Sequence, residues 1–254
     1  MADLIGKVAV VTGGARGIGA ASAEILAQRG ATVVIADTRE QLGRQTAERI
    51  TASGPGSAEF RTLDVTVEGE VTAVAEETAA AHGGIDFLMN NAGIVESSPT
   101  FELDEQTWSG TIAVNLTGTF LCAREFGRRI AGSGGGAIVN VSSIAGLKAV
   151  RPELHVAYDA SKAGVAQLTR SLAAEWASLG VRVNAVAPGY TRTEILDEVG
   201  RDDPAIVEDW LGQIPMRRFI EPSEIARVVA FLFSDDASAI TGHVLGADAG
   251  YMAV

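Results

Sequence analysis

Short apolar runs rich in Val and Ile alternate with Ala-rich segments of helical spacing along the whole 254-residue chain. Strands that are apolar on both faces and alternate with helices indicate a parallel sheet covered on both sides. A chain of this length suits one large domain and is short for two. The pattern therefore predicts a doubly wound α/β fold that forms a single domain over residues 1–254.

Two kinds of segment carry this prediction. The expected strands are 7–12, 32–37, 58–63, 86–90, 136–142, 181–187 and 243–247. The expected helices are 17–29, 39–52, 67–82, 104–131, 157–179 and 222–234. The segment 190–221 breaks the alternation, and a long excursion of this kind is typical of a segment that covers a substrate site.

Charge and composition exclude several classes of function. The formal net charge is −12 and no run of Lys or Arg exceeds two residues, so nucleic acid is not an expected partner. No apolar run reaches the roughly 20 residues of a membrane span, and the N-terminus lacks a signal-peptide pattern. We therefore expect a cytoplasmic protein. Cys122 is the only cysteine, and its apolar helical context indicates an inert thiol.

Four glycines fall within seven positions at the end of the first expected strand, in the sequence TGGARGIG. Gly13 permits a tight turn, Gly17 allows the backbone to approach a pyrophosphate, and Gly19 allows the next helix to pack closely on the sheet. The N–H groups and dipole of that helix then attract an anion. A helix that merely begins with a flexible turn would also contain glycines, so further residues must decide.

Asp37 ends the second expected strand, about twenty residues after the glycine loop. A carboxylate there accepts hydrogen bonds from an adenosine ribose and repels a 2′-phosphate, which predicts NAD rather than NADP. Arg16 opposes this interpretation, because a guanidinium in the loop pairs well with a phosphate. We give Asp37 the greater weight because it lies where the ribose is expected.

Tyr158 and Lys162 are four residues apart in an expected helix, so their side chains share one face. A free tyrosine has a pKa of about 10, and a nearby ammonium group lowers it by roughly 1–3 pH units. Such a pair can take a proton from an alcohol while a hydride leaves its carbon. The same spacing also occurs on ordinary solvated helix faces, so it is informative only together with other motifs.

Taken together, the motifs resemble those of the short-chain dehydrogenase/reductase family over essentially the whole chain. The resemblance rests on Thr12-Gly13-xxx-Gly17-Ile18-Gly19, Asn90-Asn91-Ala92-Gly93, Asn115, Ser143, Tyr158-xxx-Lys162 and Pro188-Gly189. It implies a single Rossmann-type domain with a seven-stranded parallel sheet, a nicotinamide cofactor and a homotetramer.

The resemblance also implies a catalytic role for four residues. Tyr158 would be the acid/base and Lys162 the group that lowers its pKa. Ser143 would hydrogen-bond the substrate oxygen. Neighbouring side chains on a strand face opposite ways, so only one of Ser142 and Ser143 can point into the site, and the family pattern selects Ser143. Asn115 would kink its helix and hold a proton-relay water near Lys162.

Most of the cofactor contacts are implied in the same way. In chain order the expected residues are Gly13, Arg16, Gly17, Ile18, Gly19, Asp37, Asp64, Val65, Asn90, Ala92, Gly93, Tyr158, Lys162, Pro188, Gly189, Thr191 and Thr193. Among them Asp64 and Val65 would contact adenine, and residues 188–193 would cover the nicotinamide carboxamide. No metal is expected. One departure from the family pattern is Ala249, where a glycine is commoner.

The substrate is less constrained by the sequence. The stretch 151–195 is similar to bacterial polyol dehydrogenases of the family, of the galactitol, arabinitol and sorbitol type, and His155 is a candidate substrate contact or a solvated loop residue. The apolar residues Ile195, Leu196, Ile206, Trp210 and Leu211 of the excursion suit an apolar secondary alcohol equally well.

Two further functions compete with a secondary-alcohol dehydrogenase. One is a 3-oxoacyl thioester reductase that uses NADPH, which the net charge of −12 and Asp37 both oppose. The other is a non-catalytic dinucleotide-sensing protein on the same fold, which the presence of all four catalytic positions opposes.

Overall fold

The computed structural model describes residues 4–193, 196 and 204–254 of the chain. Within these residues a single sheet of seven strands has the order β3-β2-β1-β4-β5-β6-β7, and every pairing is parallel. The strands are β1 (Val8–Thr12), β2 (Thr32–Asp37), β3 (Ser57–Thr62), β4 (Phe87–Asn90), β5 (Gly136–Val141), β6 (Val181–Pro188) and β7 (Val244–Ala247). The predicted fold class is confirmed.

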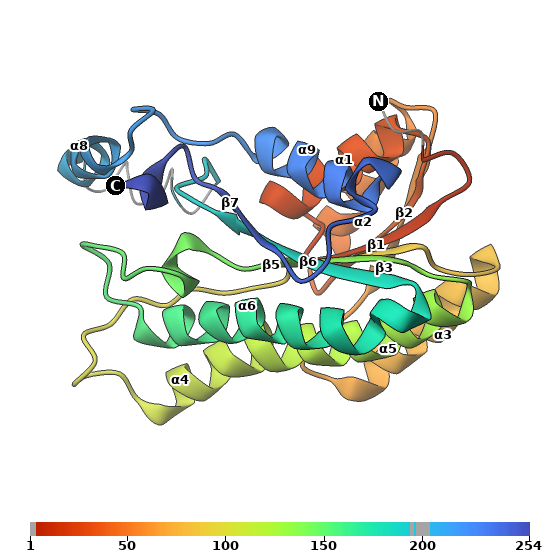
Figure 1. Cartoon of the computed structure of the whole chain (residues 1–254), viewed down its shortest axis with the longest axis horizontal. Helices are drawn as coiled ribbons and strands as arrows, with labels where there is room; N and C mark the ends of the chain where they lie inside the picture. Colours follow the sequence, from red (N-terminus) through yellow and green to blue (C-terminus); the bar gives the residue numbers. More distant parts are fainter. Residues whose placement is uncertain (1–3, 194–195, 197–203) are drawn as a thin grey trace.

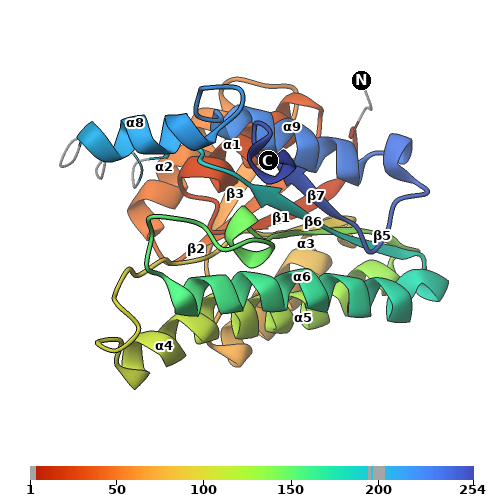
Figure 2. The same cartoon turned by 60° about the vertical axis from the view of Figure 1, so that its left-hand side comes forward.

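Helices cover both faces of this sheet (Figures 1 and 2). On one face lie α1 (Gly17–Gln28), α2 (Glu40–Thr51) and α9 (Pro222–Phe233); on the other lie α3 (Glu68–His82), α5 (Thr119–Gly132) and α6 (Val156–Trp176). The central strand β1 shows why an inner strand is apolar on both faces. Ala9 and Val11 enter one core and Val10 enters the other, and all three are fully buried.

The expected helix 104–131 is not one regular helix. It consists of α4 (Glu105–Ile112), a π-helical segment (Ala113–Gly118) and α5. In a π-helix the backbone bonding is i→i+5, so one carbonyl loses its usual helical partner. The Thr119 hydroxyl donates a hydrogen bond of 2.7 Å to the carbonyl of Asn115 inside this segment. The irregularity therefore lies at the position where the family resemblance places a kink.

The order of the strands determines where a ligand fits. The chain proceeds outward from β1 through β2 to β3, then returns to place β4 on the other side of β1. A crevice forms at such a reversal, beyond the carboxyl ends of the strands. The ends of β1, β2 and β4 lie there, at Thr12, Asp37 and Asn90.

The excursion over 190–221 contains one described helix, α8 (Pro204–Gln213). Trp210 of this helix is buried and packs on Tyr190 and Phe219, with ring centroids 5.2 Å and 6.3 Å apart. Leu196, Ile206 and Leu211 are partly buried, and Ile195 lies outside the described residues. Trp210 therefore belongs to an aromatic cluster at the base of the excursion.

No helix in the part of the chain that the structure describes has both the length and the apolar character needed to cross a membrane. Cys122 lies on α5 and is fully buried, and burial raises the pKa of its thiol to about 12. At neutral pH the thiol is therefore protonated and shielded, which agrees with the expected inert role.

Ala249 adopts a backbone conformation that favours glycine, with φ of +53°. In this region a Cβ crowds the backbone, at a cost of about 1–2 kcal/mol. We expect Ala249→Gly to raise the free energy of unfolding by about 0.5 kcal/mol, because lost methyl burial offsets part of the relief. The control Ala247→Gly, in strand β7, is expected to lower stability. Urea denaturation measures the free energy of unfolding of both variants, which is expected to rise for Ala249→Gly and to fall for Ala247→Gly. A decrease for both variants would contradict this expectation.

Candidate active site

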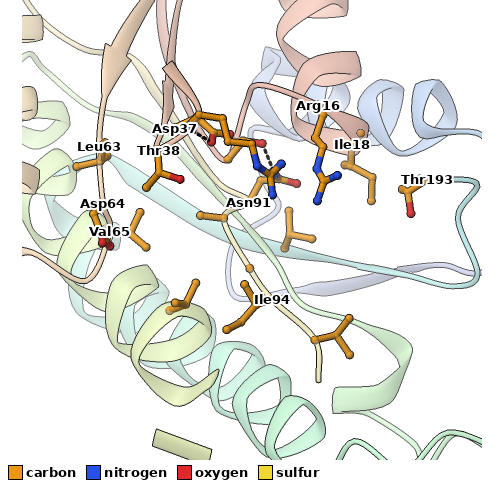
Figure 3. Close-up of a pocket in the computed structure, with 18 of the residues that line it drawn as sticks. Arg16, Ile18, Asp37, Thr38, Leu63, Asp64, Val65, Asn91, Ile94 and Thr193 are labelled. Atoms are coloured by element: carbon orange, nitrogen blue, oxygen red, sulfur yellow. Dashed lines mark hydrogen bonds between the residues drawn. The ribbon is translucent and has the colours of Figure 1, made fainter. Parts of the chain in front are cut away.

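A cavity of about 410 Å³ opens at the carboxyl edge of the sheet, beside the glycine loop. Asp37, Thr38, Asp64 and Val65 lie toward one end of it, and Thr193 lies toward the other (Figure 3). The walls come from segments far apart in the sequence. The lining residues are Gly13, Arg16, Gly17, Ile18, Asp37, Thr38, Arg39, Leu63, Asp64, Val65, Asn91, Ala92, Gly93, Ile94, Val95, Val114, Val141, Tyr158, Lys162 and Thr193.

The glycine loop has no room for side chains at its key positions. Gly13 and Gly17 have positive φ values of 62° and 56°. A Cβ added to Gly13 would lie 2.8 Å from Ala92 Cα, and one added to Gly19 would lie 2.3 Å from the Gly13 carbonyl oxygen. The loop is therefore a bare backbone cradle at the start of α1, which suits a pyrophosphate.

Asn91 holds this loop in place, a role that we did not predict. Its side-chain amide donates to the carbonyl oxygens of Thr12 (3.1 Å) and Gly13 (2.9 Å). The Thr12 hydroxyl accepts in return from the backbone N–H groups of Asn91 (3.0 Å) and Ala92 (3.2 Å). Asn90, the residue that we did predict, faces the core below and donates to Asn140 Oδ1 at 2.9 Å. The alternation of the strand separates the two amides.

Asp37 is buried at the end of β2, and both of its carboxylate oxygens accept from backbone N–H groups. Oδ2 accepts from Ala15 (3.1 Å) and Oδ1 from Arg39 (3.0 Å). Each oxygen has further lone pairs for a ribose hydroxyl. Arg16 and Arg39 also line this cavity.

Tyr158 lies where the cavity meets α6, with Ser143 and Lys162 beside it. The Ser143 side chain is near enough to lower the pKa of Tyr158, whereas the neighbouring Ser142 donates to the Lys162 carbonyl oxygen at 2.9 Å. The Lys162 ammonium group is 5.6 Å from the centroid of the Tyr158 ring and donates to the Val141 carbonyl oxygen at 2.8 Å. Of the two serines, Ser143 is therefore the one that contacts Tyr158.

The pKa of Tyr158 lies above its ordinary value of 10.0 in this structure. Burial raises it most, the hydrogen bond to Ser143 lowers it, and the charge of Asp159 raises it further. The direction is opposite to the one expected from Lys162 alone. The protein thus holds a neutral phenol at pH 7, and stabilisation of a phenolate depends on further positive charge at the site.

Burial also lowers the pKa of Lys162, from 10.5 to about 8. Between these two pH values the unfolded chain binds more protons than the folded protein, so the unfavourable contribution of Lys162 is full below pH 8 and disappears by pH 10.5. We expect Lys162→Met to raise the free energy of unfolding by up to about 3 kcal/mol at pH 7 and by little at pH 10.5. Urea titrations at both pH values test this.

The exposed Lys7→Met variant serves as the control for that titration, since the Lys7 side chain is 49% exposed in its pair with Asp86. If the increase in the free energy of unfolding of Lys162→Met did not become smaller between pH 7 and pH 10.5, the increase would come from packing rather than from removal of the buried charge.

Asn115 connects the loop after β4 to α6. Its side chain accepts from the Ile94 N–H (2.8 Å) and donates to the Ile94 carbonyl oxygen (2.9 Å) and the Ser161 hydroxyl (3.0 Å). A Cβ on Gly93 would lie 3.2 Å from Asn115 Oδ1 and 3.4 Å from Lys162 Nζ. The π-helical segment, the loop at Gly93 and the catalytic helix therefore meet at one point.

Most of the expected site residues lie on the cavity wall, but some do not. Of the predicted set the following are not among the lining residues: Gly19, Asn90, Asn115, Ser143, Pro188, Gly189 and Thr191. Pro188 ends β6, Gly189 packs against Asp248, and the Thr191 hydroxyl donates to the Gly189 carbonyl oxygen at 2.9 Å. Some lining residues that the sequence did not predict, among them Leu63, Val114 and Val141, are apolar positions at or near element ends with no motif of their own.

The geometry fits an extended dinucleotide. A bare loop at a helix start, the Asp37 carboxylate and the Tyr158–Lys162 pair all line this one cavity. A pyrophosphate, a ribose and a reacting ring need these three environments.

Comparison with known proteins agrees with this geometry. A family model described as enoyl-(acyl carrier protein) reductase matches residues 13–252. The chain is 45% identical to cis-4-hydroxycyclohexanecarboxylate dehydrogenase of Sinomonas cyclohexanicum, over 98% of this chain and 97% of that protein. It is 42% identical to the L-tagatose-forming galactitol 2-dehydrogenase of Cereibacter sphaeroides, over 98% of this chain and 96% of that protein.

A solved structure shows the same likeness. The short-chain type dehydrogenase/reductase from Mycobacterium marinum is 32% identical, with a TM-score of 0.94 and coverage of 99% of this chain and 98% of that one. The fold, the ordered motifs and these relatives lead to one conclusion: the chain belongs to the short-chain dehydrogenase/reductase family and is an oxidoreductase acting on CH–OH groups.

Proposed function

We propose that this protein is an NAD-dependent dehydrogenase that interconverts a secondary alcohol, within a polyol or vicinal diol, and its ketone. The observation that carries the proposal is the placement of Tyr158 and Lys162 together on the cavity wall, with the Lys162 ammonium group 5.6 Å from the tyrosine ring. The likeness to a galactitol dehydrogenase supports the substrate class.

The residues divide the chemistry among them. Ser143 and Tyr158 hold the carbinol oxygen, and the phenolate form of Tyr158 would accept the carbinol proton as a hydride leaves the C–H bond and the C=O bond forms. The nicotinamide of bound NAD⁺ supplies the hydride acceptor and a positive charge that favours the phenolate. Lys162 adds positive charge near the ring, and Asn115 holds α6 against the loop after β4.

The same proposal covers cofactor binding and assembly. The residues proposed to contact NAD are those of the predicted set, with Asn91 in place of the core-facing Asn90. Asp37 is proposed to select NAD over NADP. The excursion 190–221 is proposed to cover the substrate. A homotetramer is proposed from the family resemblance, with the long helices α4–α5 and α6 as packing surfaces.

A second candidate is a 3-oxoacyl thioester reductase that uses NADPH. The description of the matching family model favours an acyl-carrier substrate, and Arg16 and Arg39 on the cavity wall favour a phosphorylated ribose. Asp37 and the net charge of −12 oppose both features.

An initial-rate screen separates these functions. NAD⁺ and NADP⁺ are each tested with sugar alcohols, vicinal diols and simple secondary alcohols, and NADPH with a 3-oxoacyl thioester. Turnover of a polyol or diol with NAD⁺ is the expected result. Activity only on apolar alcohols would keep the mechanism and reject the substrate class, and NADPH-dependent reduction of the thioester alone would establish the second candidate.

A further inference from the structure

Lys162 is bonded to the end of strand β5 at two points. Its ammonium group donates to the carbonyl oxygen of Val141 at 2.8 Å, and its own backbone carbonyl oxygen accepts from the hydroxyl group of Ser142 at 2.9 Å. Both bonds are buried, and Ser142 and Lys162 are only 1% and 4% exposed. Two consecutive residues therefore hold the charged end and the backbone of one lysine.

The turn that follows Ser142 packs on the same part of α6. A Cβ added to Gly146 would lie 2.5 Å from the backbone carbonyl carbon of Lys162 and 2.7 Å from the backbone nitrogen of Ala163. The backbone of the turn Ile144–Gly146 therefore meets the backbone of the helix directly. The Ser142 hydroxyl adds a directional bond to this close contact, so it determines how α6 sits on the end of β5.

Ser142 supports the helix rather than taking part in the reaction. Its neighbour Ser143 is the serine near Tyr158, and Ser142 is not among the residues that line the cavity. In a regular α-helix the Lys162 carbonyl already accepts from the N–H group four residues later. A carbonyl oxygen has two lone pairs, so the bond from Ser142 is an additional one. The bond is thus suited to placing the helix on the sheet rather than to forming it.

We infer that Ser142 is a positioning residue, which holds the backbone of Lys162 so that the lysine ammonium group stays at the distance from Tyr158 that the reaction needs. The inference rests on the proposed function, in which positive charge near the Tyr158 ring favours the phenolate. The ammonium group is 5.6 Å from the centroid of that ring. The interaction of two charges depends on their distance and is stronger where water is excluded, so a shift of α6 on β5 changes the effect of Lys162 on Tyr158.

Ser142→Ala tests this inference, because it removes the hydroxyl group and keeps Val141, Tyr158 and Lys162. With NAD⁺ and a secondary alcohol that the unsubstituted protein oxidises, kcat is expected to fall by about 10- to 100-fold, as for a small misplacement of a catalytic group. The rise of the rate with pH is expected to move to higher pH by about one unit, because part of the effect of a nearby cation, roughly 1–3 units, is lost. Initial rates from pH 6 to pH 10 measure both changes.

Ser142→Thr separates the hydrogen bond from the packing of the site. It keeps a hydroxyl group on the same carbon, so kcat is expected to stay within about threefold of that of the unsubstituted protein. Equal losses in Ser142→Ala and Ser142→Thr would assign the effect to packing and overturn the inference.

Ser234→Ala is the matched control for a purely structural role. Ser234 is 3% exposed, and its hydroxyl donates to the Phe231 carbonyl oxygen of α9 at 2.8 Å. Its own carbonyl oxygen accepts from Arg182 at the start of β6, on the opposite edge of the sheet from the cavity. Urea denaturation is expected to show a similar loss of stability for Ser234→Ala and Ser142→Ala, whereas Ser234→Ala keeps both kcat and the pH profile.

The outcomes separate this inference from the proposed function. No turnover of any secondary alcohol by the unsubstituted protein overturns the proposed function and this inference with it. A Ser142→Ala variant that keeps its rate, or that loses rate equally at every pH, overturns this inference alone and leaves the dehydrogenase assignment in place.

Discussion

Replacing Tyr158 with Phe is expected to lower kcat for alcohol oxidation by about 10³-fold or more. The substitution removes the phenolic oxygen next to Ser143, and general acid–base catalysis contributes roughly 10²- to 10⁴-fold. The ring remains, so the packing against His155 and the cavity wall is kept. The affinity for NADH, measured by fluorescence titration, is expected to change by no more than about twofold, since Tyr158 is one of many residues on the cavity wall and its ring is kept.

The pH dependence of the normal enzyme adds a second readout. Burial holds the pKa of Tyr158 above 10.0, so the base form is scarce at neutral pH. The rate of alcohol oxidation is therefore expected to rise with pH across the neutral and alkaline range, and Tyr158→Phe removes this rise. Initial rates at fixed NAD⁺ from pH 6 to pH 10 measure it.

Tyr251→Phe is the matched control, because it removes a phenol hydroxyl from another buried tyrosine. That hydroxyl is 3.1 Å from Gln213 Oε1, away from the Ser143 contact. Its loss is expected to change kcat by no more than about threefold, as for a single neutral hydrogen bond. Turnover retained by Tyr158→Phe would overturn the assigned mechanism.

The fold was predictable because the sheet buries both faces of its strands. A segment such as β2 has no polar face, so its apolar run identifies it without ambiguity, and the predicted boundaries agree to within one or two residues. The π-helical segment at Asn115 was not readable from periodicity. Its apolar spacing continues that of a regular helix, and only the family resemblance pointed to a kink.

The site was predictable where a motif reflects a backbone conformation. It was less predictable where the role of a residue depends on the direction in which its side chain points. Glycines at 13, 17 and 19 encode the bare loop. Asn90 and Asn91 differ only in which way a strand side chain points, and that depends on pairing in three dimensions. The sequence also does not display burial, which raises the pKa of Tyr158 in this structure, against the lowering expected from Lys162.

Replacing Asp37 with Ser is expected to reverse the cofactor preference. The carboxylate that would bind the adenosine ribose is lost, and the charge that would repel a 2′-phosphate is removed while Arg16 and Arg39 remain on the cavity wall. The ratio of kcat/KM with NAD⁺ to that with NADP⁺ is expected to fall by about 100-fold or more, since hydrogen bonds to a charged group contribute about 1.5–3 kcal/mol. Initial rates with both cofactors, on one alcohol, measure the ratio.

Loss of the carboxylate also affects the loop, because Asp37 accepts the N–H groups of Ala15 and Arg39. A general loosening of the loop would weaken the binding of both cofactors. Loss of ribose selection would instead weaken the binding of NAD⁺ and strengthen that of NADP⁺. The sign of the change in kcat/KM with NADP⁺ therefore distinguishes the two effects. Glu40→Gln removes an exposed carboxylate three residues away that does not line this cavity, and it is expected to leave the ratio unchanged. If the unsubstituted protein already preferred NADP⁺, the two arginines would outweigh Asp37 in cofactor selection. That result would favour the 3-oxoacyl thioester reductase.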